Sequence, residues 1–158
     1  MVVLAIISIM VLIGAPKVID WYPRMKTKAA VNQLAGLMQK AKISAIKANR
    51  TSKIIFSPAN ESYTIFFDDG AAGNNWAIDA DDTLLASVQM AQGVDLFDTN
   101  IPFNTYGYSS RGLTDPNIPL NTYYVRFLIH TNNYYAVRLI HTGNVAVVTS
   151  TDGGVTWF

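Results

Sequence analysis

Two histidines are the residues in this sequence with the widest range of possible chemical roles. His130 and His141 each close an expected strand, and a histidine can act as a general base or bind a metal ion. No third partner stands at a recognisable spacing from either, so we interpret both as ordinary strand-edge residues. The chain has no cysteine, which excludes disulfides, thiolate metal sites and cysteine nucleophiles.

An acidic segment is the second candidate for chemistry. Its oxygen-bearing side chains are Asp68, Asp69, Asn74, Asp79, Asp81 and Asp82. Closely spaced oxygen ligands suit calcium, and the candidate ligands are Asp68, Asp69, Asp79 and Asp81. Their order differs from the calcium loop of an EF-hand, so we favour a solvated acidic loop. The sequence has no phosphate loop, nucleophile elbow or metal-ligand cluster, and it predicts neither an enzyme nor a cofactor.

Charge divides the chain into two parts. Residues 1–53 carry nine cations and one acid, a net charge of +8, whereas residues 54–158 carry three arginines and ten acids, a net charge of −7. In an assembly of many copies, the basic stem of one copy would attract the acidic heads of its neighbours, although salt would screen exposed pairs. Two solvated faces without any partner are the alternative interpretation.

The first sixteen residues contain no charge and are rich in Val, Ile and Leu. A membrane span needs about 20 apolar residues, so this run alone fits a shortened span, a buried helix or the apolar part of a signal peptide. Lys17 leads directly into further helix-forming sequence, which indicates a retained segment. Proline removes a backbone donor, so we expect kinks or unwinding near Gly14–Pro16 and at Pro23.

From Lys26 onward the sequence has the period of an amphipathic helix. Apolar residues recur at spacings of three and four: Val31, Leu34, Met38, Ala41, Ala45 and Ala48. Lys26, Gln33, Lys40 and Lys47 recur every seven residues on another side. Residues 1–49 therefore predict one interrupted helix about 70 Å long.

The remainder predicts short strands separated by turns. The expected strands are residues 52–56, 62–67, 84–90, 94–97, 103–108, 123–130, 134–141, 145–150 and 155–158. The fold class is α+β: a long N-terminal helix, apolar then amphipathic, in residues 1–50, and an antiparallel sheet or sandwich head in residues 51–158. The aromatic residues, including Tyr123, Tyr134, Trp76 and Trp157, suit strands.

Two nearly repeated runs, residues 123–130 and 134–141, predict a hairpin. A three-residue loop would place Arg126 opposite Arg138, which is unfavourable. We therefore expect a two-residue turn at Asn132 and Asn133.

The first 22 residues strongly resemble the N-terminal helix of type IV pilins and type II secretion pseudopilins, on the run MVVLAIISIMVLIGAPKVIDWY. Pro16 matches that family's helix-breaking proline, and residues 29–49 match its amphipathic second half. The family's mature chains begin with a phenylalanine and the run T-L-I-E-L, whose glutamate falls two residues upstream of Met1. We expect that the sequence lacks its first part or that its start was misassigned; a subunit without that glutamate is the alternative.

The head loosely resembles H-type pseudopilins and related minor pilins in strand order and turns. That pattern has basic residues after a glycine like Gly143 and two positions further on, and some minor pilins bind DNA with them. This chain has Asn144 and Ala146 there, so we do not expect nucleic-acid binding.

The resemblance implies a structural subunit that assembles through its apolar helix into a pilus-like filament. The implied filament-core and membrane residues are Val2, Leu4, Ile6, Ile9, Leu12, Gly14 and Pro16. The implied partners are identical or homologous pilin subunits, the inner membrane before assembly, an assembly platform and a leader peptidase. The alternatives are a minor pilin that binds DNA for uptake and a membrane-tethered binding head.

Overall fold

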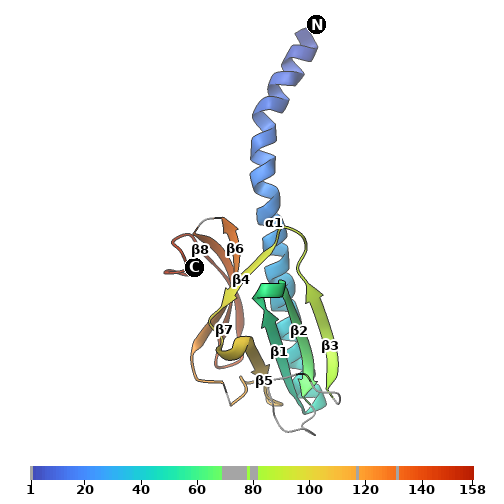
Figure 1. Ribbon diagram of the computed structural model, residues 1–158, viewed down its shortest axis with the longest axis vertical. Helices are drawn as coiled ribbons and strands as arrows, with labels where there is room; N and C mark the ends of the chain where they lie inside the picture. Colours follow the sequence, from blue (N-terminus) through green and yellow to red (C-terminus); the bar gives the residue numbers. More distant parts are fainter. Residues whose placement is uncertain (1, 69–77, 79–81, 117, 131) are drawn as a thin grey trace.

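The computed structural model describes residues 2–68, 78, 82–116, 118–130 and 132–158. In these residues the chain forms one long helix, α1, followed by eight strands with two short 3-10 turns. Figure 1 shows the N-terminal half of α1 projecting beyond a head, where the second half of the helix packs against two sheets. The predicted α+β class is confirmed.

The helix α1 spans Val2–Ala48 and ends where the sequence predicts. Asn49 follows in the left-handed conformation, with φ at 52°. The backbone N–H of Asn49 donates to the carbonyl of Ile46 at 3.3 Å, and that of Arg50 donates to Ala45 at 3.1 Å. Asn accepts positive φ more readily than most residues, so it ends the helix at little cost.

Of the expected kinks or unwinding near Gly14–Pro16 and at Pro23, the unwinding is wrong for the single chain. α1 is helical without a break through both Pro16 and Pro23, and Figure 1 shows its N-terminal half curving. A proline withholds one donor while the hydrogen bonds of neighbouring turns persist, so a helix can bend and continue. The Thr27 hydroxyl also donates to the Pro23 carbonyl at 3.1 Å.

The amphipathic half of α1 buries the predicted stripe. Its fully buried residues are Val31, Leu34, Met38, Ala41 and Ala45. Ala48, predicted to belong with them, is exposed because it is the last residue of α1, next to the turn that leaves the helix. The repeating residues Gln33, Lys40 and Lys47 are exposed, as expected.

Sheet A has the strand order β3-β2-β1-β5. Its strands are β1 (Thr51–Ser57), β2 (Ser62–Asp68), β3 (Thr83–Gln89) and β5 (Thr105–Tyr108), all antiparallel to their neighbours. The turn Pro58–Asn60 joins β1 to β2, and Glu61 completes it with φ at 48°. The expected strand at residues 103–108 begins two residues late, because Pro102–Asn104 forms a 3-10 turn.

Sheet B has the strand order β4-β6-β7-β8. Its strands are β4 (Asp95–Thr99), β6 (Thr122–His130), β7 (Asn133–Ile140) and β8 (Val145–Ser150), again all antiparallel. Among the described residues, a hydrophobic cluster joins both sheets to α1. Its buried members from the strands are Ile54, Phe56, Tyr63, Ile65, Tyr106, Tyr108, Leu96, Tyr123, Val125, Phe127, Val137 and Leu139.

The β6–β7 hairpin keeps the two arginines apart, as predicted, but through a different register. Arg126 lies opposite Ala136, and Arg138 lies opposite Tyr124. β7 begins at Asn133, one residue earlier than the expected turn allows, and a bulge between Leu128 and His130 sets the register. The turn contains Asn132, with φ at 67°, and Thr131, which lies outside the described residues.

The expected last strand, residues 155–158, is wrong. Only Phe158 pairs with β8, through two backbone hydrogen bonds with Thr149 at 3.0 and 3.1 Å. Gly153 and Gly154 have positive φ values of 77° and 85°, which turn the chain away from an extended path. The C-terminal segment is therefore a loop against the outer side of sheet B.

Candidate functional site

The predicted filament-core residues all lie on the part of α1 that projects beyond the head (Figure 1). They are Val2, Leu4, Ile6, Ile9, Leu12, Gly14 and Pro16, and each has helical backbone conformation. Across the described residues, no helix combines the length and hydrophobicity that crossing a membrane requires. This half of the helix is covered by no other element in Figure 1.

Three residues with large, mostly apolar side chains lie on one side of α1 where it leaves the head, and we call them the apolar collar. Trp21, Tyr22 and Met25 are 58%, 57% and 49% exposed, although each has a large apolar side chain. Thr27, only two residues after Met25, is already buried. Sequence reasoning missed this collar, because a helical period assigns residues to faces but does not show where along the helix the head begins.

The cations near the collar fall into two groups. Lys26 is held by the head: its ammonium lies 3.5 Å from the Gln92 carbonyl and 4.6 Å from the centre of the Tyr22 ring. Arg24 and Lys28 are exposed. Together with Trp21, Met25 and Tyr135 of β7, they line one surface hollow, which we call the junction hollow.

A hydrogen bond fixes the C-terminal part of α1 to the head. The Lys42 ammonium donates to the Gly143 carbonyl at 2.9 Å. Gly143 has φ at 73°, and a Cβ atom there would lie 2.3 Å from the carbonyl oxygen of Gly112, so this close approach requires glycine. The two loops and the helix are thereby packed into one unit.

Lys53 does not belong to the basic stem with which its position groups it. Its side chain is completely buried in sheet A and pairs with Asp68 of β2. The two residues lie on adjacent strands, with Lys53 opposite Phe66 and Thr51 opposite Asp68, so they meet diagonally on one face. Asp68, one of the four candidate calcium ligands, is therefore engaged in an ion pair with Lys53.

The other calcium candidates, Asp69, Asp79 and Asp81, lie outside the described residues, as do Asn74 and Trp76. Among the described residues, no group of three or more His, Cys, Asp or Glu side chains could hold a metal ion.

The two histidines lie near opposite ends of β7. His130 is opposite Asn133 at the start of that strand, and His141 follows its last residue, Ile140. His141 is exposed. The hairpin therefore does not bring them together.

The C-terminal loop is organised around Asp152, which sequence reasoning overlooked. Its carboxylate accepts hydrogen bonds from the backbone N–H groups of Val155 and Thr156 and from the hydroxyls of Ser150 and Thr156. These bonds, the Thr156 hydroxyl first, hold the pKa of Asp152 well below its ordinary value. The spacing Ser150-x-Asp152-x-Gly154-x-Thr156 was the available signal.

Aromatic pairs cover the outer side of sheet B. Trp157 stacks on Tyr124 with ring centres 4.7 Å apart and planes at 15°, and Phe97 meets Tyr134 at 5.4 Å. Arg126 pairs with Asp98 through two contacts and lies 5.9 Å from the Phe97 ring. These contacts hold the C-terminal loop and β4 to the sheet.

Comparison with known proteins assigns this arrangement to a class. Residues 30–144 match the family described as Type II transport protein GspH, and the chain belongs to this family. Among curated proteins, no sequence match is found.

Solved structures share the fold. The minor pseudopilin EpsH from the Type 2 Secretion System of Vibrio cholerae superposes with a TM-score of 0.57 at 12% identity, covering 77% of this chain and 95% of that chain. The type IV minor pilin FimU of Pseudomonas aeruginosa superposes with a TM-score of 0.56 at 13% identity, covering 78% and 89%.

The predicted pilin and pseudopilin superfamily is thus confirmed. Its family gives the chain a structural role in a pilus-like, envelope-associated filament built with other pilin subunits.

Proposed function

We propose that this chain is a filament subunit, a pilin or pseudopilin, that assembles through the N-terminal half of α1. The observation that carries the proposal is an apolar helical segment, uncharged through Pro16, that projects from a head with a hydrophobic core of its own. In a filament, neighbouring helices would cover it, and apolar contacts between helices would replace lipid at little cost.

Before assembly, the same segment would hold the subunit in the inner membrane. A leader peptidase would remove a short basic leader, and an assembly platform would extract the subunit into an extracellular or periplasmic filament. The support for this sequence of events is the uncharged run of residues 1–16, the resemblance of that run to the pilin helix and the family to which residues 30–144 belong.

The test is a charge in the apolar half. We expect Ile9→Asp to abolish filaments in cells, because a carboxylate would have to be buried among apolar helices. Asn121→Asp is the matched control: it adds the same charge at an exposed head position, where the new carboxylate still accepts from the Thr122 N–H. Normal filaments from Ile9→Asp cells would reject the assignment.

Assembly should also unwind α1 near Gly14–Lys17. Gly14 is a weak helix residue and Pro16 lacks a donor, so this stretch is the least costly place for the stem to adapt to its neighbours. The single chain is helical there. A filament density map with unbroken helix through this stretch would contradict the prediction.

The second candidate function, DNA uptake, has little support from the head. Asn144 is exposed and Ala146 half-buried at the positions where the resembled pattern has cations. Lys53, one of the nine cations of residues 1–53, is buried. DNA affinity depends on several accessible cations that release counterions, so we expect negligible binding at physiological salt.

A gel-shift titration with residues 26–158 tests this expectation. The fragment must include the second half of α1, because Leu34 and Met38 are part of the core of the head. Binding at micromolar concentration or below that weakens steeply with salt would favour a DNA-uptake pilin.

A further inference from the structure

We infer that the junction hollow binds anionic phospholipid headgroups and thereby sets the depth of the head at the membrane surface before assembly. This inference rests on the proposed membrane stage and adds a partner chemistry and a site. The hollow is lined by Trp21, Arg24, Met25, Lys28 and Tyr135.

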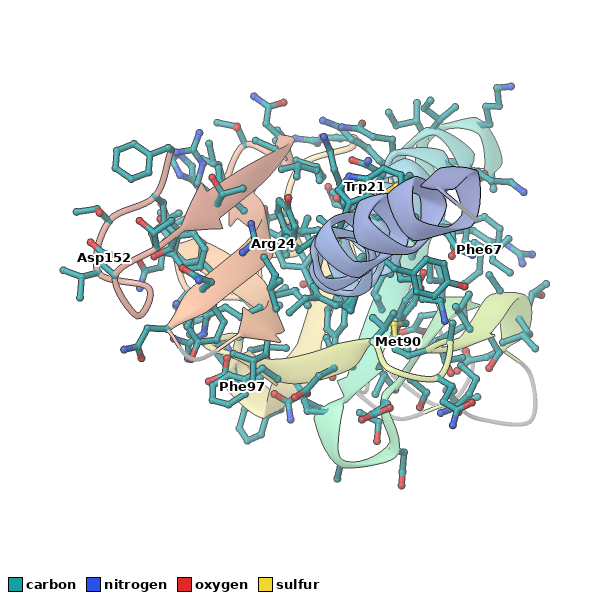
Figure 2. The ribbon with its side chains drawn as sticks, turned by 90° about the horizontal axis from the view of Figure 1, so that it is seen from above. Trp21, Arg24, Phe67, Met90, Phe97 and Asp152 are labelled. Carbon is teal, nitrogen blue, oxygen red and sulfur yellow. The ribbon has the colours of Figure 1, made fainter. Side chains whose placement is uncertain are left out.

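The first observation is that cations and an indole share one helix face. Lys17, Trp21, Arg24 and Lys28 follow at spacings of four, three and four, which place them in one stripe along α1. Figure 2, which views the head from the N-terminal side, shows Arg24 directed from α1 toward sheet B, with Trp21 beside it on the helix. One acid, Asp20, lies within this stretch of α1, so the region keeps a positive balance.

The second observation is the distance along α1 between the end of the uncharged run and the hollow. Trp21 follows Pro16, the end of the uncharged run, by five residues, or about 7–8 Å of helix. Headgroups extend roughly 5–8 Å beyond the hydrocarbon on each side of a bilayer. Helical side chains lean toward the N-terminus, so the long side chain of Arg24 would be able to extend toward the same level at a membrane surface.

The chemistry of the collar is that of a membrane interface. Trp and Tyr are enriched at the boundary between hydrocarbon and water, and the side chains of Trp21 and Tyr22 are more than half exposed. Arg24 would meet phosphate groups. Lys28 lies four residues, or about 6 Å of helix, further from the bilayer, and it would be attracted to the anionic surface across a distance on the order of a Debye length. Asp152, by contrast, lies far from α1 across sheet B in Figure 2.

An acidic head of another subunit is the competing occupant. The lipid surface is favoured because the hollow begins only five residues beyond the end of the apolar run, and because exposed Trp, Tyr and Met side chains would be left in water beside a purely charged partner.

The experiment measures partition of the full chain into vesicles of phosphatidylcholine alone and of phosphatidylcholine with phosphatidylglycerol. We expect stronger partition into the anionic vesicles, with Arg24→Gln and Lys28→Gln each reducing it about fivefold and the pair on the order of twentyfold. Partition into neutral vesicles should stay unchanged. Lys26→Gln is the matched control, because it removes the same charge from a side chain that Gln92 and Tyr22 already hold.

Four outcomes would overturn the inference. Equal partition of the wild-type chain into both vesicles would leave the membrane stage standing and remove the site. An equal loss with Lys26→Gln and Arg24→Gln would indicate general electrostatic attraction without a site. Loss of filaments by the double variant, with wild-type vesicle binding, would assign the hollow to another subunit. Failure of the wild-type chain to enter either vesicle would reject the membrane stage itself.

Discussion

The two halves of α1 are both rich in apolar residues, yet only the second half packs against the head of its own chain. In the second half the apolar residues recur with the helical period, and Val31, Leu34 and Met38 are completely buried in the chain's own head. In the first half no charged residue occurs through Pro16, and this half projects beyond the head. A periodic stripe serves folding of one chain, whereas a helix that is apolar on all sides needs other molecules around it.

The sharpest test of this comparison places one charge in each half. Leu34→Asp should unfold the head, with a loss of about 5 kcal/mol or more, because a carboxylate would be buried without a partner in the apolar cluster. Ile9→Asp should leave the melting temperature of the head unchanged. Thermal melts followed by circular dichroism, on the full chain in detergent, would check both variants. A large loss of head stability with Ile9→Asp would contradict the division.

A buried cation tests the boundary between the basic stem and the head. Removing one partner of a buried ion pair costs about 3–5 kcal/mol, so Lys53→Met should lower the free energy of unfolding by that order. Arg126→Met, at the partly exposed pair with Asp98, should cost about 1 kcal/mol or less. Urea titrations would measure the difference. Equal losses for the two variants would show that the buried pair contributes no more to the free energy of unfolding than the partly exposed pair.

Alkaline pH should destabilise the head. Burial raises the pKa of Tyr63 to about 12 and raises that of Tyr108 further, with Tyr106 adding to the effect. Because the folded pKa exceeds the ordinary value of 10, the stabilising contribution is present below pH 10 and is lost as pH rises toward 12. Neither hydroxyl has a hydrogen-bond partner among the described residues.

The matching variants are Tyr63→Phe and Tyr108→Phe. Each should shift the alkaline unfolding midpoint upward, and neither should destabilise the head at neutral pH, because each removes an unsatisfied buried hydroxyl. An unchanged midpoint in both variants would show that other groups cause alkaline unfolding.

The smallest expected effect lies in the C-terminal loop. Asp152→Asn should weaken the hydrogen bonds to Val155 and Thr156 and loosen the stacking of Trp157 on Tyr124. In the wild-type chain, the depressed pKa of Asp152 gives a contribution that is present above its ordinary value and is lost as pH falls through the folded value.

Tryptophan fluorescence and the melting temperature would separate the local effect from the global one. We expect the emission to change while the melting temperature shifts less than with Lys53→Met. A global unfolding caused by Asp152→Asn would contradict a purely local role.

Much of the architecture could be predicted from local patterns. The helical period of residues 31–45 predicted the buried face of α1, and alternating aromatic and β-branched runs predicted β1, β2, β6, β7 and β8. Positions with special backbone demands were less predictable. The bulge before His130 and the positive φ at Gly153 and Gly154 changed the hairpin register and removed the last strand.

The sequence by itself determined that this chain has an apolar stem, an amphipathic helix and a β-rich head, because period and composition are local properties. Only the tertiary structure decided which side chains act together. Lys53 was grouped with the stem by position, but β1 and β2 pair it with Asp68. Lys26 and Arg24 are both cations near Tyr22, but only the packed head holds Lys26 and leaves Arg24 beside Tyr135. Such contacts join residues far apart along the chain, and no local pattern encodes their distance.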